Sequence, residues 1–240
     1  MGKRVCNNIE KCLKVIDRRK MMPIPKQEIA AIVQQFYFGE NDGAKLIHAL
    51  PAFAPGEHEK IFCGYWEQDE QKHDRLFHVI LPEYGIKPDG FNPLFQGLFG
   101  IAWECVNEKD WVKCMAISAV IENIALTAGE YLYEHGDDPV KKILDQILPD
   151  EKKHLGFSHQ QLEIYAKETK NKEKIREVLR KVKALSFSLG KKNLFTTHDV
   201  AVSNAAEKKL LAQLEIIGIK EMYVKNGNGF IRNLFFELII

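Results

Sequence analysis

Apolar residues recur along most of the chain at steps of three and four positions, which is the spacing of one buried face of an α-helix. Proline and glycine interrupt this pattern at a few points and divide it into segments. Four long helices are predicted in this way, over residues 27–50, 57–84, 111–135 and 140–167. The predicted fold class is therefore all-α, with a four-helix bundle as its core.

Residues 85–110 combine glycine- and proline-rich turns with a short apolar helix. This connection is long enough for the second and third helices to run parallel to each other. Pro149 lies inside the fourth helix and is expected to kink it, because proline cannot donate a backbone hydrogen bond.

The ends of the chain are expected to add to the bundle rather than to form a second fold. Residues 1–25 are predicted to form an amphipathic lead helix. A further helix is expected near residues 199–217, followed by an apolar tail. We expect one domain over residues 1–240, with its bundle core at about 27–167 and a C-terminal helical extension at about 168–240.

A repeated pattern of acidic residues and histidines stands out within the helices. A glutamate on an apolar face is followed 30 residues later by Glu-x-x-His, and the same unit recurs with a spacing of 29 residues. Residues three apart share a helix face, so each Glu-x-x-His points a carboxylate and an imidazole the same way. The six candidate metal ligands are Glu40, Glu70, His73, Glu122, Glu151 and His154.

A single Glu-x-x-His is more often a solvated helix face, but two copies at matched spacing favour a metal site. Glu122 lies in a strongly apolar stretch, where an unpaired buried carboxylate costs several kcal/mol, so it needs a metal ion or a cationic partner. Four carboxylates and two imidazoles suit two iron ions, with manganese as an alternative, better than zinc.

Asp69 and Asp150 each precede a Glu-x-x-His unit directly. Either aspartate could accept the outer N–H of a ligand histidine that lies across the bundle on the partner helix. The alternative is that both are surface residues.

Small residues surround the two lone glutamates, and apolar residues adjoin them. Such an arrangement leaves an apolar space beside the metal ions that suits an acyl chain, although close packing of helices is an equal explanation. The candidate pocket residues are Phe36, Gly39, Gly43, Ala44, Ser118, Ala119, Ala125 and Leu126.

Composition limits the partners. The net charge of +1 argues against DNA or another polyanion as a partner of the whole surface. No run of about 18 apolar residues predicts a transmembrane segment, and no signal peptide is evident, so a cytoplasmic protein is expected. Five cysteines form no C-x-x-C pair, so electrons for redox chemistry must come from an external donor.

Residues 167–183 contain eight Lys or Arg and three Glu. Their apolar stripe favours an ordinary solvated helix. The alternative is a docking face for an acidic protein such as a ferredoxin or an acyl carrier protein.

The doubled ligand pattern resembles that of ferritin-like di-iron carboxylate proteins. In ligand order, spacing, chain length and two trailing helices, the layout is most similar to the cyanobacterial aldehyde-deformylating oxygenases. This resemblance implies a ferritin-like bundle with a long crossover between its second and third helices and extra terminal helices. It also implies that the six residues bind iron, that O2 is used to convert a fatty aldehyde to an alkane and formate, and that ferredoxin supplies electrons. The family carries tyrosines where this chain has Ile47, Gly129 and Leu132.

Three functions follow from these patterns. The first is a di-iron oxygenase or oxidase that activates O2 and acts on an apolar substrate, such as a fatty aldehyde or acyl compound. The second is an iron oxidase or peroxidase like ferritin or rubrerythrin. The third is a hydroxylase of tRNA bases, for which residues 167–183 would face the RNA.

Overall fold

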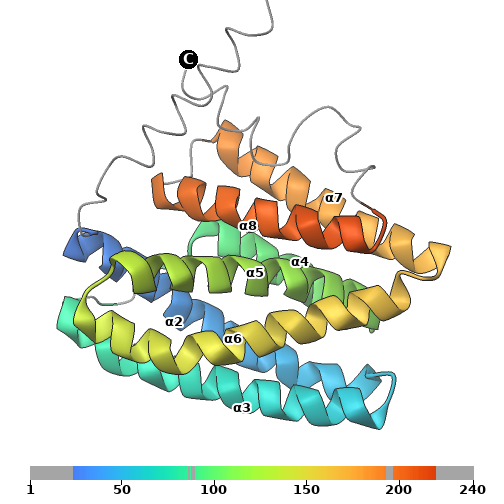
Figure 1. Cartoon of the computed structure of the whole chain (residues 1–240), viewed down its shortest axis with the longest axis horizontal. Helices are drawn as coiled ribbons and strands as arrows, with labels where there is room; N and C mark the ends of the chain where they lie inside the picture. The colour runs from blue at the N-terminus through green and yellow to red at the C-terminus, as the bar shows by residue number, and fades with distance from the viewer. Residues whose placement is uncertain (1–23, 86, 88–89, 193–196, 220–240) are drawn as a thin grey trace, which may run out of the picture.

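Two antiparallel helical hairpins form the core of the computed structural model, which describes residues 24–85, 87, 90–192 and 197–219. The first hairpin pairs α2 (Lys26–Ala49) with α3 (Glu57–Ile80), and the second pairs α5 (Trp111–His135) with α6 (Asp138–Tyr165). The two hairpins pack against each other as a four-helix bundle (Figure 1). The predicted all-α fold class is confirmed over the described residues, where every regular element is a helix.

Helix ends follow from local chemistry. The side chain of Asp110 caps the start of α5 by accepting hydrogen bonds from the backbone N–H groups of Val112 and Lys113. Asp137 caps α6 in the same way, with a proline in the first turn. Short 3-10 helices, η1 (Leu50–Phe53) and η2 (Leu81–Tyr84), continue α2 and α3, so the second predicted helix ends as a tighter turn.

A long crossover joins α3 to α5 and contains α4 (Pro93–Asn107). Gln34 and Gln35 of α2 donate side-chain hydrogen bonds to the carbonyl oxygen of Gly90, which fixes the crossover against the bundle. The predicted crossover is confirmed, and it lets α3 and α5 run parallel. α6 continues through Pro149 as one helix.

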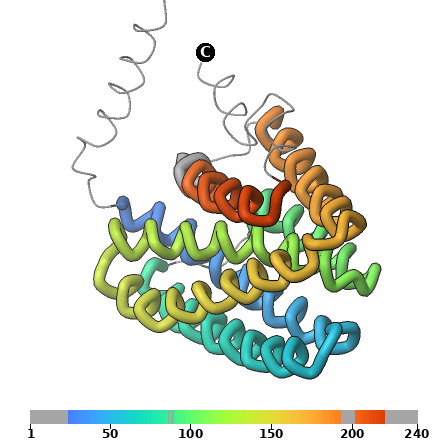
Figure 2. The backbone as a smooth tube through the Cα atoms, turned by 45° about the vertical axis from the view of Figure 1, so that its right-hand side comes forward, coloured from blue at the N-terminus to red at the C-terminus, as the bar shows by residue number. Residues whose placement is uncertain are grey.

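Helices α7 (Thr169–Lys191) and α8 (Thr197–Ile216) lie over α5 on the side away from α3 (Figures 1 and 2). The apolar stripe predicted in the basic segment is buried, with Ile175 and Val182 among its residues. Several of its cations pair with acidic groups of this chain: Lys174 with Asp110 at 2.7 Å and Lys181 with Glu104 at 2.9 Å. The predicted lead helix and the apolar tail lie outside the described residues, and the single-domain assignment stays a prediction.

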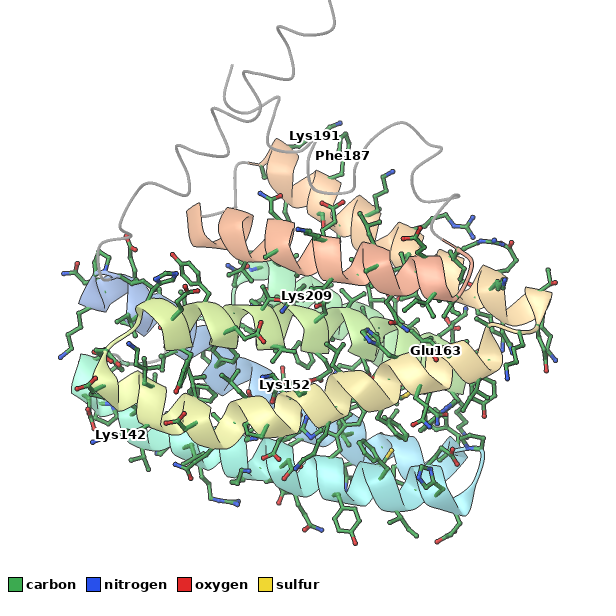
Figure 3. The ribbon with its side chains drawn as sticks, in the orientation of Figure 1. Lys142, Lys152, Glu163, Phe187, Lys191 and Lys209 are labelled. Carbon is green, nitrogen blue, oxygen red and sulfur yellow. The ribbon has the colours of Figure 1, made fainter. Side chains whose placement is uncertain are left out.

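Most of α5 is buried by its neighbours. An 18-residue stretch of α5 has a mean hydropathy of 1.4, which would also suit a membrane span. Because 78% of that stretch is buried inside the structure, it resembles the core helix of a helical domain. Lys152 and Glu163 of α6, by contrast, lie on the outer face of the bundle (Figure 3).

Two apolar clusters occupy opposite ends of the bundle. Trp66, Met115 and Ala119 belong to the first cluster, and Phe36 and Leu126 belong to the second. The buried acidic residues and histidines lie between these clusters, so the sequence places a polar centre in the middle of an apolar core.

Candidate metal centre

The six predicted ligand residues lie together in the middle of the bundle. They form two overlapping groups, in each of which one nitrogen or oxygen atom per residue lies within 4.8 Å of the others. The first group is Glu40, Glu70, His73 and Glu151, and the second is Glu70, Glu122, Glu151 and His154. Glu70 and Glu151 belong to both groups. The arrangement is consistent with a site for two metal ions with two shared carboxylates.

Each of the four bundle helices supplies part of this cluster. The three-residue spacing turns Glu70 and His73 of α3 to one face, and α6 presents its own Glu-x-x-His from the opposite side. The side chains are shielded from solvent, since His73 is 0% exposed and Glu151 is 2% exposed.

Both histidines present Nδ1 to the carboxylates and Nε2 to an aspartate on the other hairpin. His73 Nδ1 lies 3.2 Å from Glu40 Oε2, and its Nε2 lies 3.5 Å from Asp150 Oδ2. The Nε2 atom of His154 lies 3.3 Å from Asp69 Oδ2. An aspartate at the outer nitrogen leaves the inner nitrogen free to bind a metal ion.

Basic residues hold the outer aspartate on α6 in place. Asp150 accepts hydrogen bonds from Lys153 at 2.7 Å and from Lys72, which reaches across from α3. Burial raises the pKa of Asp150, but the bonds from Lys153 and Lys72 outweigh burial and lower it below the usual value. The hydrogen bond with His154 likewise lowers the pKa of Asp69. Both aspartates are therefore charged acceptors near neutral pH.

Three of the four inner carboxylates have the opposite tendency. Burial raises the pKa values of Glu40, Glu70 and Glu122, and the neighbouring carboxylates raise those of Glu70 and Glu122 further. Burial also raises the pKa of the fourth, Glu151, but the two imidazoles outweigh burial and lower it. Burial lowers the pKa of His73, but Glu40 and Glu151 outweigh it and raise this pKa to about 11. The cluster therefore favours any positive charge that enters it, from protons or from metal cations.

Two unsatisfied atoms are consistent with a site for metal ions. His154 Nδ1 is buried within the cluster without a hydrogen-bond partner. Glu151 Oε1 lies 3.1 Å from His73 Nδ1 but lacks the geometry of a hydrogen bond. Buried polar atoms are rarely left without partners, so both atoms are placed as ligands of a cation would be. Oxygen and imidazole donors suit iron or manganese.

Trp66 makes a contact with the cluster that helical spacing alone did not reveal. Its indole Nε1–H donates a 2.8 Å hydrogen bond to Glu70 Oε1, and its ring stacks on the His154 imidazole with centroids 5.0 Å apart. The four-residue step from Trp66 to Glu70 is a sequence feature that could have indicated this bond.

The two glycines near Glu40 differ in what surrounds them. A Cβ atom at Gly43 would lie 2.7 Å from Glu70 Oε2, so Gly43 leaves room for that carboxylate. A Cβ atom at Gly39 would meet nothing within 4 Å. Gly39 therefore borders open space, whereas a larger residue at Gly43 would press on the carboxylate of Glu70, a predicted ligand.

A cavity of about 1320 Å³ adjoins the cluster, with Glu40, Glu70, Glu122 and Glu151 in its wall. Five of the eight predicted pocket residues line it: Phe36, Gly39, Gly43, Ser118 and Ala125. The other three, Ala44, Ala119 and Leu126, do not line it.

The aldehyde-deformylating oxygenases carry tyrosines at three positions, and these positions differ from one another in their surroundings in this chain. Ile47 lines the cavity. A Cβ atom at Gly129 would lie 2.8 Å from Leu148 Cδ2, so helix packing accounts for this glycine, and Leu132 is fully buried in the second apolar cluster.

Comparison with known protein families gives no match, and comparison with curated protein sequences gives none either. Among solved structures, the chain is similar to a Synechococcus protein described as having aldehyde deformylating oxidase activity. The two share 17% sequence identity with a TM-score of 0.66, over 88% of this chain and 96% of the other. The chain therefore shares the fold of this Synechococcus protein, in agreement with the sequence resemblance.

Proposed function

We propose that this protein is an oxidoreductase that holds two metal ions, with iron favoured over manganese, and uses O2 to oxidise an apolar substrate. The observation that carries the proposal is the opening of the buried Glu/His cluster onto a large, mainly apolar cavity. A centre that handled only iron ions would not need such a cavity, whereas a substrate with a long apolar part would fill it.

The proposed metal ligands are the six residues of the cluster: Glu40, Glu70, His73, Glu122, Glu151 and His154. These carboxylates and imidazoles would hold a pair of iron ions, which would supply electrons for the reduction of O2. Asp69 and Asp150 orient the imidazoles, and Trp66 fixes the carboxylate of Glu70 through its N–H.

The protein environment also controls access. Apolar residues at both ends of the cluster exclude bulk water, and the cavity leads a substrate to the side of the cluster formed by α2 and α5. Because the described cysteines, Cys63, Cys105 and Cys114, are buried as free thiols, we propose an external electron donor such as a ferredoxin.

The experiment that tests this proposal combines metal analysis with turnover. Protein is loaded anaerobically with ferrous iron, its metal content is measured, and O2 is added with a reductant and a panel of fatty aldehydes, acids and alkanes. We expect two ions per chain and a substrate-derived product by mass spectrometry, both lost in Glu122→Ala. Rapid oxidation of iron with release of ferric mineral and no organic product would instead identify an iron oxidase.

A further inference from the structure

The cavity runs along one helix and extends beyond the metal cluster in both directions. Lining residues of α2 extend from Lys26 at its first turn to Ile47 near its last, and Glu40 lies between them. Lys26 precedes Glu40 by fourteen positions, about 21 Å along the helix, and Ile47 follows it by seven, about 10 Å, at a rise of about 1.5 Å per residue. The cluster therefore lies partway along the cavity.

The short end of the cavity, beyond the cluster, is buried and mostly apolar. Leu46 and Ile47 are each 3% exposed, and Phe99 of α4 is 5% exposed. Ile121 and Ser118 of α5 also line this inner end, where Ser118 contributes a hydroxyl group. A charged or strongly polar group would lose its hydration there without adequate replacement.

The long end leads to the protein surface and is polar. Lys26 and Glu83 line it and are exposed to solvent, and Glu28, which is half-buried, lines it as well. Gln34 and Gln35 lie along this part, where they hold the backbone of Gly90. A polar head group could keep its hydrogen bonds at this mouth, so the two ends of the cavity differ in the chemistry that they accept.

We propose that the cavity binds an unbranched acyl chain whose head group stays at the mouth and whose methyl end occupies the inner end. The metal cluster then faces carbon atoms within the chain. This inference rests on the proposed function and defines its substrate more closely. A ligand whose head group sat at the metal ions could fill the cavity in only one of its two directions and would leave the other empty, and protein interiors do not favour such voids.

The position of the acyl chain along the cavity, here called its binding register, determines which carbon atom can react. Insertion of one oxygen atom at that position would convert a CH2 group to CHOH. The second oxygen atom of O2 would leave as water, with two electrons from a one-electron protein donor and two protons from solvent. The head group would be unchanged, in contrast to a reaction at a terminal carbonyl.

Paramagnetic relaxation measures this register without turnover. The protein is loaded with Mn²⁺, mixed with uniformly ¹³C-labelled hexadecanoic acid, and compared with a diamagnetic Zn²⁺-loaded sample. We expect the largest relaxation enhancement on carbons in the interior of the chain and smaller effects on the carboxyl and methyl carbons. The largest effect on the carboxyl carbon, or no enhancement on any carbon of a Mn²⁺-loaded sample, would overturn the inference. A protein that binds no Mn²⁺ or iron would instead overturn the proposed function.

Variants at Ile47 test the inner end directly. Ile47→Phe shortens it, so the methyl end stops earlier and the relaxation maximum should move towards the methyl carbon. Ile47→Ala deepens it, and the maximum should move towards the head group even if the phenylalanine variant fails to fold. Ile80→Phe is the matched control, because Ile80 is equally buried but does not line the cavity. An unchanged maximum in Ile47→Ala would contradict the proposed register.

Discussion

At the scale of single residues, a set of atoms around each histidine decides how well the centre binds metal. The Nε2 atoms of His73 and His154 meet Asp150 and Asp69 across the hairpins, at 3.5 and 3.3 Å. Lys72 and Lys153 in turn hold Asp150. A charged acceptor at the outer nitrogen fixes the orientation of the imidazole ring and makes the inner nitrogen a better ligand.

Removal of either aspartate should therefore weaken metal binding while the fold is kept. For Asp69→Ala and Asp150→Ala we expect metal affinity to fall about 10- to 100-fold, with unchanged helix content. Competition with a chelator measures the affinity, and circular dichroism measures the helix content. Asp145→Ala is the control, since Asp145 lies exposed on the same helix as Asp150. Equal affinities in all three variants would mean that the contacts with histidine have no role in metal binding.

The two glycines of α2 allow a second test at this scale. Gly39→Ala places a methyl group in open space and should raise the free energy of unfolding by about 0.5–1 kcal/mol, because alanine favours a helix more than glycine does. Gly43→Ala places the same group against Glu70 Oε2 and should lower metal affinity. Urea unfolding and metal titration of both variants separate the two effects. Identical behaviour would show that Glu70 moves aside freely.

At the scale of helices, a hydrogen bond between α5 and α8 lies next to the cavity. Asn123 is 1% exposed, and its side-chain N–H donates a 2.6 Å hydrogen bond to the backbone oxygen of Ala206. Val202 and Ser203 of α8 line the cavity a turn earlier. The bond thus ties a cavity wall to the helix that carries Glu122.

We expect Asn123→Ala to loosen α8 while the bundle stays folded. Amide hydrogen exchange should become faster over residues 202–216 and stay unchanged in α2 and α3, because the lost hydrogen bond joins α5 to α8. Lys209→Ala removes an exposed contact of α8, the 2.7 Å pair with Glu130, and should have a smaller effect. Faster exchange throughout the bundle in Asn123→Ala would assign this bond to global stability instead.

Sequence periodicity predicted helices well because each helix needs only its own spacing of apolar residues and its own caps. It located the doubled Glu-x-x-His for the same reason, since i and i+3 share a face wherever a helix forms. It could not supply contacts between distant segments. The contrast between Gly39 and Gly43 depends on where Glu70 of the next helix points, and the pairing of Lys174 with Asp110 depends on how α7 docks.

At the scale of the whole molecule, stability and metal content depend on each other through protons. Without metal, burial raises the pKa of Glu70 and Glu122 well above 4.5, and nearby carboxylates raise that of His73 from 6.5 to about 11. A group whose pKa is higher in the folded state stabilises that state below its unfolded pKa, and this contribution is lost as pH rises through the folded value.

The metal-free protein should consequently lose stability as pH rises from 6.5 towards 11, because these are the pKa values of His73 in the unfolded and folded states. Metal ions replace the protons, so the metal-loaded protein should lose less, and the stabilisation by metal should grow with pH. Urea unfolding of both forms at a series of pH values measures the difference. Glu122→Gln removes one carboxyl group whose pKa is raised, so the stability of the metal-free form should depend less on pH. A difference between the two forms that does not change with pH would contradict this coupling.

Each hairpin supplies the aspartate that contacts the histidine of the other hairpin, and this arrangement also affects how the chain folds. Each hairpin is a local structure that can form early, because its helices are neighbours in sequence. Each nevertheless carries a histidine whose orienting aspartate belongs to the other hairpin. High-affinity metal capture is thus possible only after the hairpins have docked. The rate of metal uptake during refolding therefore reports the rate at which the hairpins dock. An excess of metal should slow the separation of the two hairpins more than it slows fraying within either hairpin.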